Sequence, residues 1–270
     1  MKALLKQLAS QIDGDLHYDD MTKALYATDA SVYRQLPLAV ALPKNTIDIQ
    51  KILRFASKNQ IVLIPRGAGT SLAGQCVGNG IVVDLSKYMN QILEINTEEK
   101  WIRVQPGVVR DELNKFLESY GFFFGPNTST ANRCNIGGMV GNNSCGSTSI
   151  VYGSTRDHVL ELKTVLSDGS EAVFGELDQF EFDKRKKGTS MEANIYQHIE
   201  KTLSEKDNQV HIQKNYPKPS IQRRNTGYAL DILLKSKMFS EAEIPFNFCN
   251  LLCGSEGTLA FTTEIKLNLV

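Results

Sequence analysis

The sequence has 270 residues, of which 41% are hydrophobic and 22% charged, values typical of a globular protein with one large core or two modest ones. Its 30 basic residues balance its 30 acidic ones, so nothing in the net charge favours a nucleic acid or an anionic membrane as partner. No apolar run approaches the roughly 20 residues of a membrane span, and the N-terminus does not read as a signal peptide, so we expect a cytoplasmic protein.

The first third of the chain predicts alternating helices and buried strands, an α/β arrangement. Residues 1–15 and 45–60 show the apolar spacing of amphipathic helices, and the second of these helices has a polar cap at its first or second residue. Two largely apolar runs, 61–64 and 81–85, predict short strands that are buried on both faces.

The middle of the chain changes to α+β character. Residues 91–107 and 159–174 predict two antiparallel hairpins, because apolar and polar residues alternate on either side of a polar connection. The helix expected between the hairpins ends at a glycine, Gly121. The residues expected on its apolar face are Leu113, Phe116, Leu117 and Tyr120.

The last third of the chain shows weaker apolar periodicity than the first two thirds. The charged segment 181–194 is expected to be an exposed loop that leads into a helix at 195–203. Residues 254–260 predict a glycine-rich turn, and a strand follows it to Val270. Because that strand ends the sequence without a cap or a tail, we expect a domain cut from a longer protein.

The five cysteines are odd in number, and their spacings match no zinc or iron–sulfur pattern. We therefore predict reduced thiols and no metal site. These residues are Cys76, Cys134, Cys145, Cys249 and Cys253.

A glycine-rich loop, residues 65–80, joins two of the predicted strands and contains five glycines. Glycine allows consecutive backbone N–H groups to converge on an anion. The loop lacks the Lys of a P-loop after Gly74, and it lacks the third glycine of the Rossmann pattern after Gly67 and Gly69. A parallel crossover usually needs a helix of a dozen or more residues, and the stretch SLAGQCVGNG cannot supply an amphipathic helix of that size. We predict a loop of backbone donors for a phosphate group, with a flexible surface turn as the alternative.

Two further segments are rich in hydrogen-bond donors. Residues 126–154 interleave glycine with Asn, Ser and Thr, and apolar residues such as Ile136 and Met139 favour an ordered loop over a disordered one. Residues 254–260 form a third, shorter segment. Three such loops imply one extended ligand, and FAD, with its pyrophosphate, ribityl chain and two ring systems, fits this requirement.

The blocks PRGAGTSLAGQ, NIGGMVGNNSCGSTSIVYGSTRDHV and GSEGTLA resemble the FAD-binding domain of the vanillyl-alcohol oxidase / p-cresol methylhydroxylase superfamily. They are most similar to the FAD-linked dehydrogenases of D-lactate, glycolate and D-2-hydroxyglutarate, including long bacterial members with a C-terminal iron–sulfur module. Segment 224–234 resembles the Gly-Tyr segment of that family. The resemblance implies an α+β, p-cresol methylhydroxylase-type domain with subdomains 1–85 and 86–270, FAD between them, and cap and C-terminal domains absent from this chain.

The resemblance also assigns residues to the cofactor. Backbone N–H groups of the first block would wrap the pyrophosphate, namely those of Arg66, Gly67, Ala68, Gly69, Thr70 and Ser71. The ribityl or flavin end would lie near Gly74 and Gln75. The isoalloxazine ring or the pyrophosphate would be approached by Pro126, Ser129 and Thr130. The cofactor would further be lined by Gly137, Gly138, Gly141, Asn142, Ser144 and Gly146, and the site closed by Glu256, Gly257 and Thr258.

Some relatives bind FAD covalently through a histidine in the first block, where this chain has Thr70 or Ser71. We therefore predict non-covalent FAD. The histidines all lie outside that block, at His17, His158, His198 and His211.

Catalytic residues of the family come from parts that follow the third block, so no catalytic residue is assigned and the chain alone is expected to be inactive. The resemblance implies that the longer protein oxidises a D-2-hydroxyacid by hydride transfer to FAD. Electrons would pass to a quinone, a cytochrome or a fused iron–sulfur domain, and the longer protein could associate peripherally with a membrane. The alternatives are a sugar or aldonolactone oxidase, a UDP-sugar reductase, or a non-catalytic nucleotide-binding module.

Overall fold

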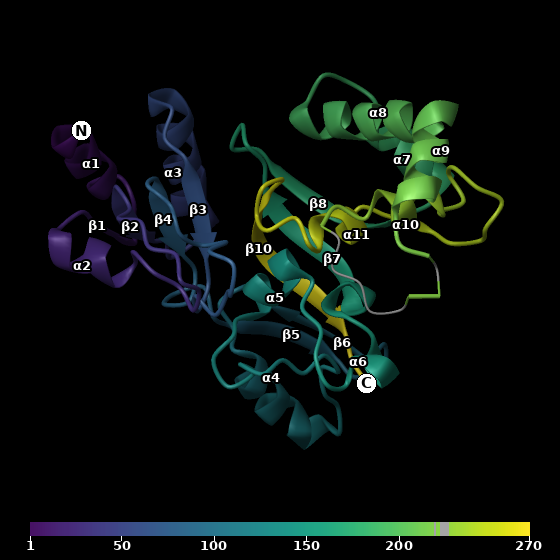
Figure 1. The fold of residues 1–270 in the computed structure, drawn as a ribbon, viewed down its shortest axis with the longest axis horizontal. Helices are drawn as coiled ribbons and strands as arrows, with labels where there is room; N and C mark the ends of the chain where they lie inside the picture. The colour runs from purple at the N-terminus through teal and green to yellow at the C-terminus, as the bar shows by residue number, and fades with distance from the viewer. Residues whose placement is uncertain (219, 222–226) are drawn as a thin grey trace.

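The computed structural model describes residues 1–218, 220–221 and 227–270. The strands form two sheets, which lie side by side with loops between them (Figure 1). The first sheet has the order β1-β2-β4-β3, and the second has the order β5-β6-β10-β7-β8-β9. Every strand of the first sheet precedes residue 85 and every strand of the second follows it. We keep the division into residues 1–85 and 86–270 as a proposal, which this grouping of strands supports.

The first sheet is mainly parallel. β2 and β3 both run parallel to β4, and β1 is antiparallel to β2. The central strands β2 and β4 are completely buried. The bounds are β1 (Asp15–His17), β2 (Ala39–Leu42), β3 (Leu63–Arg66) and β4 (Ile81–Asp84).

Helices α1 (Lys2–Ala9) and α3 (Thr46–Asn59) cover one face of this sheet, as their apolar spacing predicted. The Asn45 side chain caps α3 by accepting the backbone N–H of Asp48 at 2.9 Å. Helix α2 (Asp20–Leu25) follows β1. The opposite face of the sheet packs against loop residues, including Cys76, so the first glycine loop lies directly on the sheet.

The prediction for residues 61–64 was wrong in one respect. β3 begins at Leu63 and is the edge strand of the sheet, so it is not buried on both faces, and Val62 is 63% exposed. An apolar run does not reveal whether a strand lies at the centre or at the edge, because that depends on its neighbours. β2, which the sequence reading did not identify, occupies the central position instead.

The second sheet is antiparallel throughout, and its last strand in sequence, β10, lies between β6 and β7. The residues of β10 alternate between buried and half-exposed, so one face of the strand packs on the core. Both predicted hairpins, β5–β6 and β7–β8, are confirmed. The bounds are β5 (Ile92–Asn96), β6 (Trp101–Val104), β7 (Val159–Val165), β8 (Glu171–Leu177), β9 (Phe246–Asn247) and β10 (Phe261–Asn268).

The buried face of the second sheet carries α4 (Arg110–Leu117) and α5 (Ile136–Asn142), which share its core. The predicted helix is confirmed and continues as η1 (Glu118–Tyr120), followed by Gly121 at φ 75°. Its predicted apolar face was too wide. Leu113 and Leu117 are buried, whereas Phe116 and Tyr120 pack on each other near the surface.

Two predicted loops contain helices. The segment 126–154 includes α5 and α6 (Ser149–Tyr152), and η2 (Thr155–His158) follows it. The charged segment 181–194 holds the end of α7 (Gln179–Arg185) and the start of α8 (Met191–Ser204). Its one buried aromatic residue, Phe182, packs edge-on against Tyr196 with ring centroids 5.6 Å apart. That contact comes from α8, so the charge pattern of the segment could not show it.

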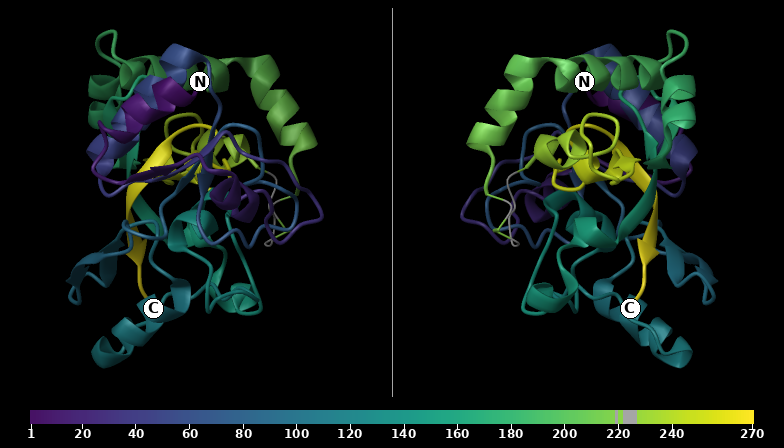
Figure 2. Two further views of the ribbon diagram at one scale, coloured as in Figure 1. Left: turned by 90° about the vertical axis from the view of Figure 1, so that its left-hand side faces the viewer. Right: turned by 90° about the vertical axis from the view of Figure 1, so that its right-hand side faces the viewer.

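Of the remaining helices, α9 (Lys206–Asn215) and α10 (Leu230–Leu234) lie beyond β8, and α11 (Cys249–Leu252) packs against β7 (Figures 1 and 2). Part of the expected Gly-Tyr segment, residues 224–226, lies outside the described residues. None of the helices in the described ranges is both long and apolar enough to span a bilayer.

Candidate functional site

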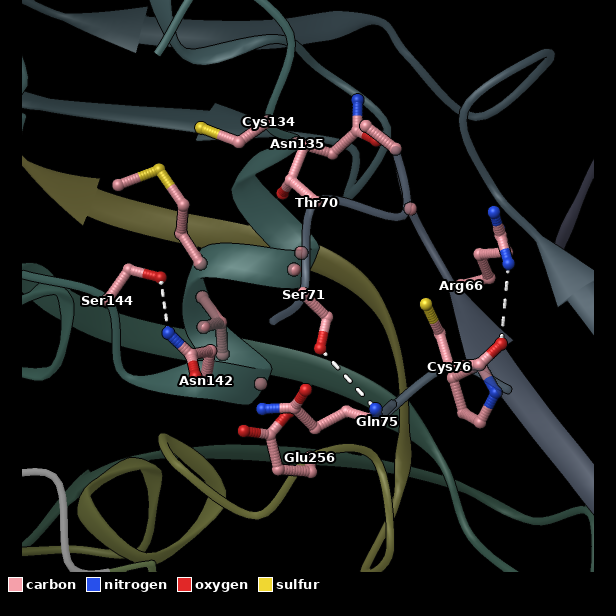
Figure 3. A pocket seen from close by; sticks show the side chains of 18 of the residues that line it. Arg66, Thr70, Ser71, Gln75, Cys76, Cys134, Asn135, Asn142, Ser144 and Glu256 are labelled. Atoms are coloured by element: carbon pink, nitrogen blue, oxygen red, sulfur yellow. Dashed lines mark hydrogen bonds between the residues drawn. The ribbon is translucent and has the colours of Figure 1, made fainter. Parts of the chain in front are cut away.

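A cavity of about 820 Å³ lies between the first glycine loop, α5 and the turn that precedes β10 (Figure 3). Residues from all three predicted blocks therefore meet at one place. The predicted residues that line it are Arg66, Gly67, Ala68, Gly69, Thr70, Ser71, Gln75, Ser129, Thr130, Gly137, Gly138, Gly141, Asn142, Ser144, Glu256 and Gly257.

The first wall of the cavity is the loop between β3 and β4. These two strands are adjacent and parallel, yet no helix connects them, as the glycine-rich composition of residues 65–80 predicted. The loop turns through left-handed backbone at Gly69 and Gly74, with φ of 66° and 77°. Among the described residues, the backbone N–H groups of 67–72 have no acceptor. A row of unpaired donors at a cavity wall is suited to an anion.

The Arg66 side chain points away from the cavity. Its guanidinium donates to the carbonyl oxygens of Thr28 at 2.9 Å and Cys76 at 3.4 Å, and it lies over the Tyr26 ring, 5.1 Å from the centroid. Figure 3 shows this orientation. Arg66 therefore holds the loop in shape, and its backbone belongs to the ladder with β4, where its carbonyl oxygen accepts the Leu85 N–H at 3.2 Å.

The second wall is α5. Its apolar residues Ile136, Met139 and Val140 are buried in the core of the second sheet, which fixes the helix. Gly137 packs closely on Pro106, where an added Cβ would lie 2.5 Å from the Pro106 Cβ. Gly138 instead faces open space, with nothing within 4 Å of an added Cβ. Its N–H also has no acceptor among the described residues, so α5 presents bare backbone to the cavity.

The third wall is the turn 254–260. The Glu256 N–H donates to the Gly141 carbonyl oxygen at 2.9 Å, which ties the turn to α5. Glu256 adopts φ 53°, rare for a residue with a side chain. Its carboxyl lies beside the Gln75 amide (Figure 3). Partial desolvation of the carboxyl raises the pKa of Glu256, although the residue as a whole is exposed, and the hydrogen bond with Gln75 partly offsets that rise.

Four predicted residues do not line the cavity but support its walls. An added Cβ on Gly74 would lie 2.8 Å from the Tyr33 ring, and one on Gly146 would overlap the Asn127 carbonyl. The Pro126 carbonyl oxygen accepts a hydrogen bond from Arg110 Nε at 3.1 Å. The Thr258 hydroxyl donates to the Ser255 carbonyl oxygen at 2.6 Å. These residues shape the loops around the cavity, and their contact with a cofactor stays a prediction.

Several polar residues line the cavity that the sequence reading left out. They lie within three residues of predicted ones in the sequence, so proximity to those residues was the available signal. They include Cys76, Arg133, Cys134, Asn135 and Cys145. No histidine is among the described residues at the cavity wall, and no cluster of potential metal ligands occurs in the described part of the chain.

The residues present fit FAD. The volume lies near the upper end of the roughly 300–1,000 Å³ that ligand sites occupy. The free N–H groups of 67–72 and Gly138 suit the pyrophosphate, and the accessible apolar residues Pro65, Leu72 and Ala260 suit a flat ring. The cavity therefore combines anion-binding backbone with apolar surface.

Comparisons with known proteins agree with this chemistry. The model of the family described as "FAD binding domain" matches residues 37–175. A D-2-hydroxyglutarate dehydrogenase of Haemophilus influenzae is 40% identical over 270 residues, covering 96% of this chain and 25% of that protein. The glycolate oxidase subunit GlcD of Bacillus subtilis is 39% identical over 169 residues, covering 61% of this chain and 36% of that protein. The chain thus spans about a quarter of the length of the Haemophilus relative.

A solved structure shares the fold. An alkyldihydroxyacetonephosphate synthase superposes with a TM-score of 0.67 at 18% sequence identity, covering 100% of this chain and 40% of the other. At that identity the likeness concerns the fold alone, and it confirms the α+β class expected from the sequence.

Proposed function

The chain belongs to the FAD-binding domain family, and from this premise we propose that one FAD, held without a covalent bond, occupies the cavity between the three glycine-containing segments. FAD is the cofactor that the family and the relatives indicate. The residues that bind it are our proposal, as is the division of the domain after Leu85.

The observation that carries this proposal is the set of unpaired backbone donors. The N–H groups of 67–72 line one wall and the N–H of Gly138 lines another. A cavity with such donors on two sides can stabilise an anion such as a pyrophosphate through backbone N–H groups. Gln75, Asn142 and Ser144 offer side-chain hydrogen bonds to hydroxyl and ring groups.

A bound flavin supplies the capacity to accept a hydride. The residues of this chain bind and orient the cofactor. Glu256, Gly257 and the first loop would exclude water from one side of it. We assign no catalytic base within the chain, and we propose that the chain alone does not turn over a substrate.

For the longer protein we propose oxidation of a D-2-hydroxyacid such as D-2-hydroxyglutarate, D-lactate or glycolate. The Haemophilus relative, named a D-2-hydroxyglutarate dehydrogenase, supports this proposal. The electrons would then pass to a quinone, a cytochrome or a fused iron–sulfur domain.

Titration of the purified chain with FAD tests the cofactor site. We expect binding of one FAD per chain, seen as quenching of flavin fluorescence, and weaker binding of NAD⁺ and ATP. A folded chain that takes up no FAD would contradict the proposal. Reduction of the flavin in the full-length protein by D-2-hydroxyglutarate, D-lactate and glycolate, compared side by side, tests the substrate class.

A further inference from the structure

Asn135 is a buried polar residue at the cavity wall, and one end of its side chain has no partner. It is 3% exposed and directly precedes α5. Its Nδ2 donates to the Gly107 carbonyl oxygen at 2.7 Å. Its Oδ1 is shielded from water and accepts no hydrogen bond from the described residues. The bond to Gly107 fixes which end of the amide faces which way, so Oδ1 is held facing the first glycine loop.

Gly67 is the point where the first glycine loop approaches this oxygen. A Cβ on Gly67 would lie 2.8 Å from Asn135 Oδ1, closer than real side chains approach. In Figure 3 the Asn135 side chain lies beside the chain that leads from Arg66 into the loop. The backbone donors of that loop, residues 67–72, are unpaired among the described residues. An unpaired acceptor and a row of unpaired donors therefore face each other between the two sheets.

We propose that Asn135 is the positioning residue of the first glycine loop. Its Nδ2 anchors it to Gly107, and its Oδ1 accepts a backbone N–H from residues 67–69 when FAD fills the cavity. The inference rests on the proposed FAD site. Anion binding by the other loop donors draws the loop inward, and Asn135 pairs with a donor that the anion does not reach.

The chemistry of an amide suits this role. A buried acceptor without a partner is unfavourable, so a hydrogen bond that forms on binding adds to the affinity for FAD. Aspartate at position 135 could not donate to Gly107, and its charge would repel the pyrophosphate. Gly67 belongs to the same arrangement, because any side chain there would push the loop away from Asn135.

A double-mutant cycle tests the proposal, with FAD dissociation constants measured for the wild type, Gly67→Ala, Asn135→Ala and the double variant. We expect each single change to weaken FAD binding about tenfold. In the Asn135→Ala background the clash with Oδ1 is gone, so Gly67→Ala should then cost much less. The matched control is Asn132→Ala, since Asn132 is exposed and accepts from the neighbouring Arg133. Its affinity should equal that of the wild type.

Hydrogen–deuterium exchange of the peptide covering residues 65–72 supplies a second readout. FAD should protect its amides in the wild type, and Asn135→Ala should lose part of that protection. If Asn135→Ala does not fold, Asn135→Ser, which keeps a small acceptor, replaces it in the same measurement. Two results would overturn this inference and leave the FAD site intact. One is additive losses of FAD affinity in the double-mutant cycle, and the other is equal protection of the 65–72 amides by FAD in the wild type and the variant. A folded wild-type chain that binds no FAD would overturn both.

Discussion

Gly257, in the turn before β10, packs directly against Pro65 of β3: a Cβ added to Gly257 would lie 2.7 Å from Pro65 Cγ. The contact joins the last segment of the chain to the start of the first glycine loop and so closes one side of the cavity. The backbone of Gly257 also has φ 72°, a left-handed conformation. Glycine is therefore required here both for space and for backbone conformation.

Gly257→Ala should weaken FAD binding at least about tenfold and lower the free energy of unfolding by about 1–3 kcal/mol, because it combines strain with a clash. The matched control is Gly188→Ala. Gly188 also has positive φ, 100°, but an added Cβ there would meet nothing within 4 Å, and the residue does not line the cavity. The control should lose stability and keep its FAD affinity. Equal affinities of both variants in an FAD titration would contradict the prediction.

Gly138→Ala should separate stability from binding. Gly138 lies within α5 and faces the cavity, so alanine improves the helix by up to about 1 kcal/mol while its methyl group occupies ligand space. We expect an unchanged or higher melting temperature and a higher dissociation constant for FAD. Gly146→Ala should instead lower the stability of the chain. Its Cβ would overlap the Asn127 carbonyl, so the variant should lose about 3 kcal/mol or more of stability.

Asp48 should be essential for the first sheet. Its buried carboxylate accepts backbone N–H groups from Asp13 at 2.8 Å, Gly14 at 2.9 Å and Lys44 at 3.0 Å. Asp48→Ala leaves these donors without their acceptor, and we expect a loss of about 3 kcal/mol in urea unfolding. Asp13→Ala removes one exposed contact, to Asn45 at 3.3 Å, and should change stability by less than about 1 kcal/mol. Similar losses in the two variants would refute this role for Asp48.

Glu256 should make stability depend on pH. Its pKa is raised in the folded chain because its carboxyl is partly desolvated, although the residue as a whole is exposed. The protonated form is therefore favoured by folding. That contribution is complete below the ordinary pKa of a glutamate and is lost as pH rises through the raised value. Glu256→Gln should be more stable than the wild type at about pH 7, and the difference should vanish in acid. If the melting temperatures of the wild type and of Glu256→Gln changed in parallel with pH, this role of Glu256 would be contradicted.

The flavin should be released by acid precipitation. None of the described residues lining the cavity is a histidine, and Thr70 and Ser71 occupy the first loop. We expect all the flavin in the supernatant, with the spectrum of free FAD. Flavin that stays with the denatured protein would show a covalent bond, and Cys76, Cys134 and Cys145 would then be the side chains to examine first, because all three line the cavity.

The elements that could be predicted are those with a strong local pattern. Helix α3 and both hairpins were predicted because their apolar periodicity and turn residues are contained in single short segments. α7 was missed because Phe182 is surrounded by charges and becomes a core residue through its contact with Tyr196. The burial of β3 was overestimated because its edge position follows from the strand order.

The candidate site, too, was predicted where the signal is local and missed where it depends on distant contacts. The glycines and amides of three separate blocks are enough to indicate a loop-bound dinucleotide, because that composition has few other uses. Asn135 was left out, since its importance lies in the distance to Gly67, a residue far away in the sequence. Arg66 was included, although its side chain points away from the cavity.

By itself, the sequence determined the class of ligand and the three segments that we propose bind it, because backbone flexibility and donor density are properties of local composition. The tertiary structure decided which donors remain free, which glycines face the cavity and which only allow close packing. Gly138 and Gly146 look alike in the sequence, yet one faces open space and the other abuts a carbonyl. Such differences arise from the distances between segments, which local composition does not contain.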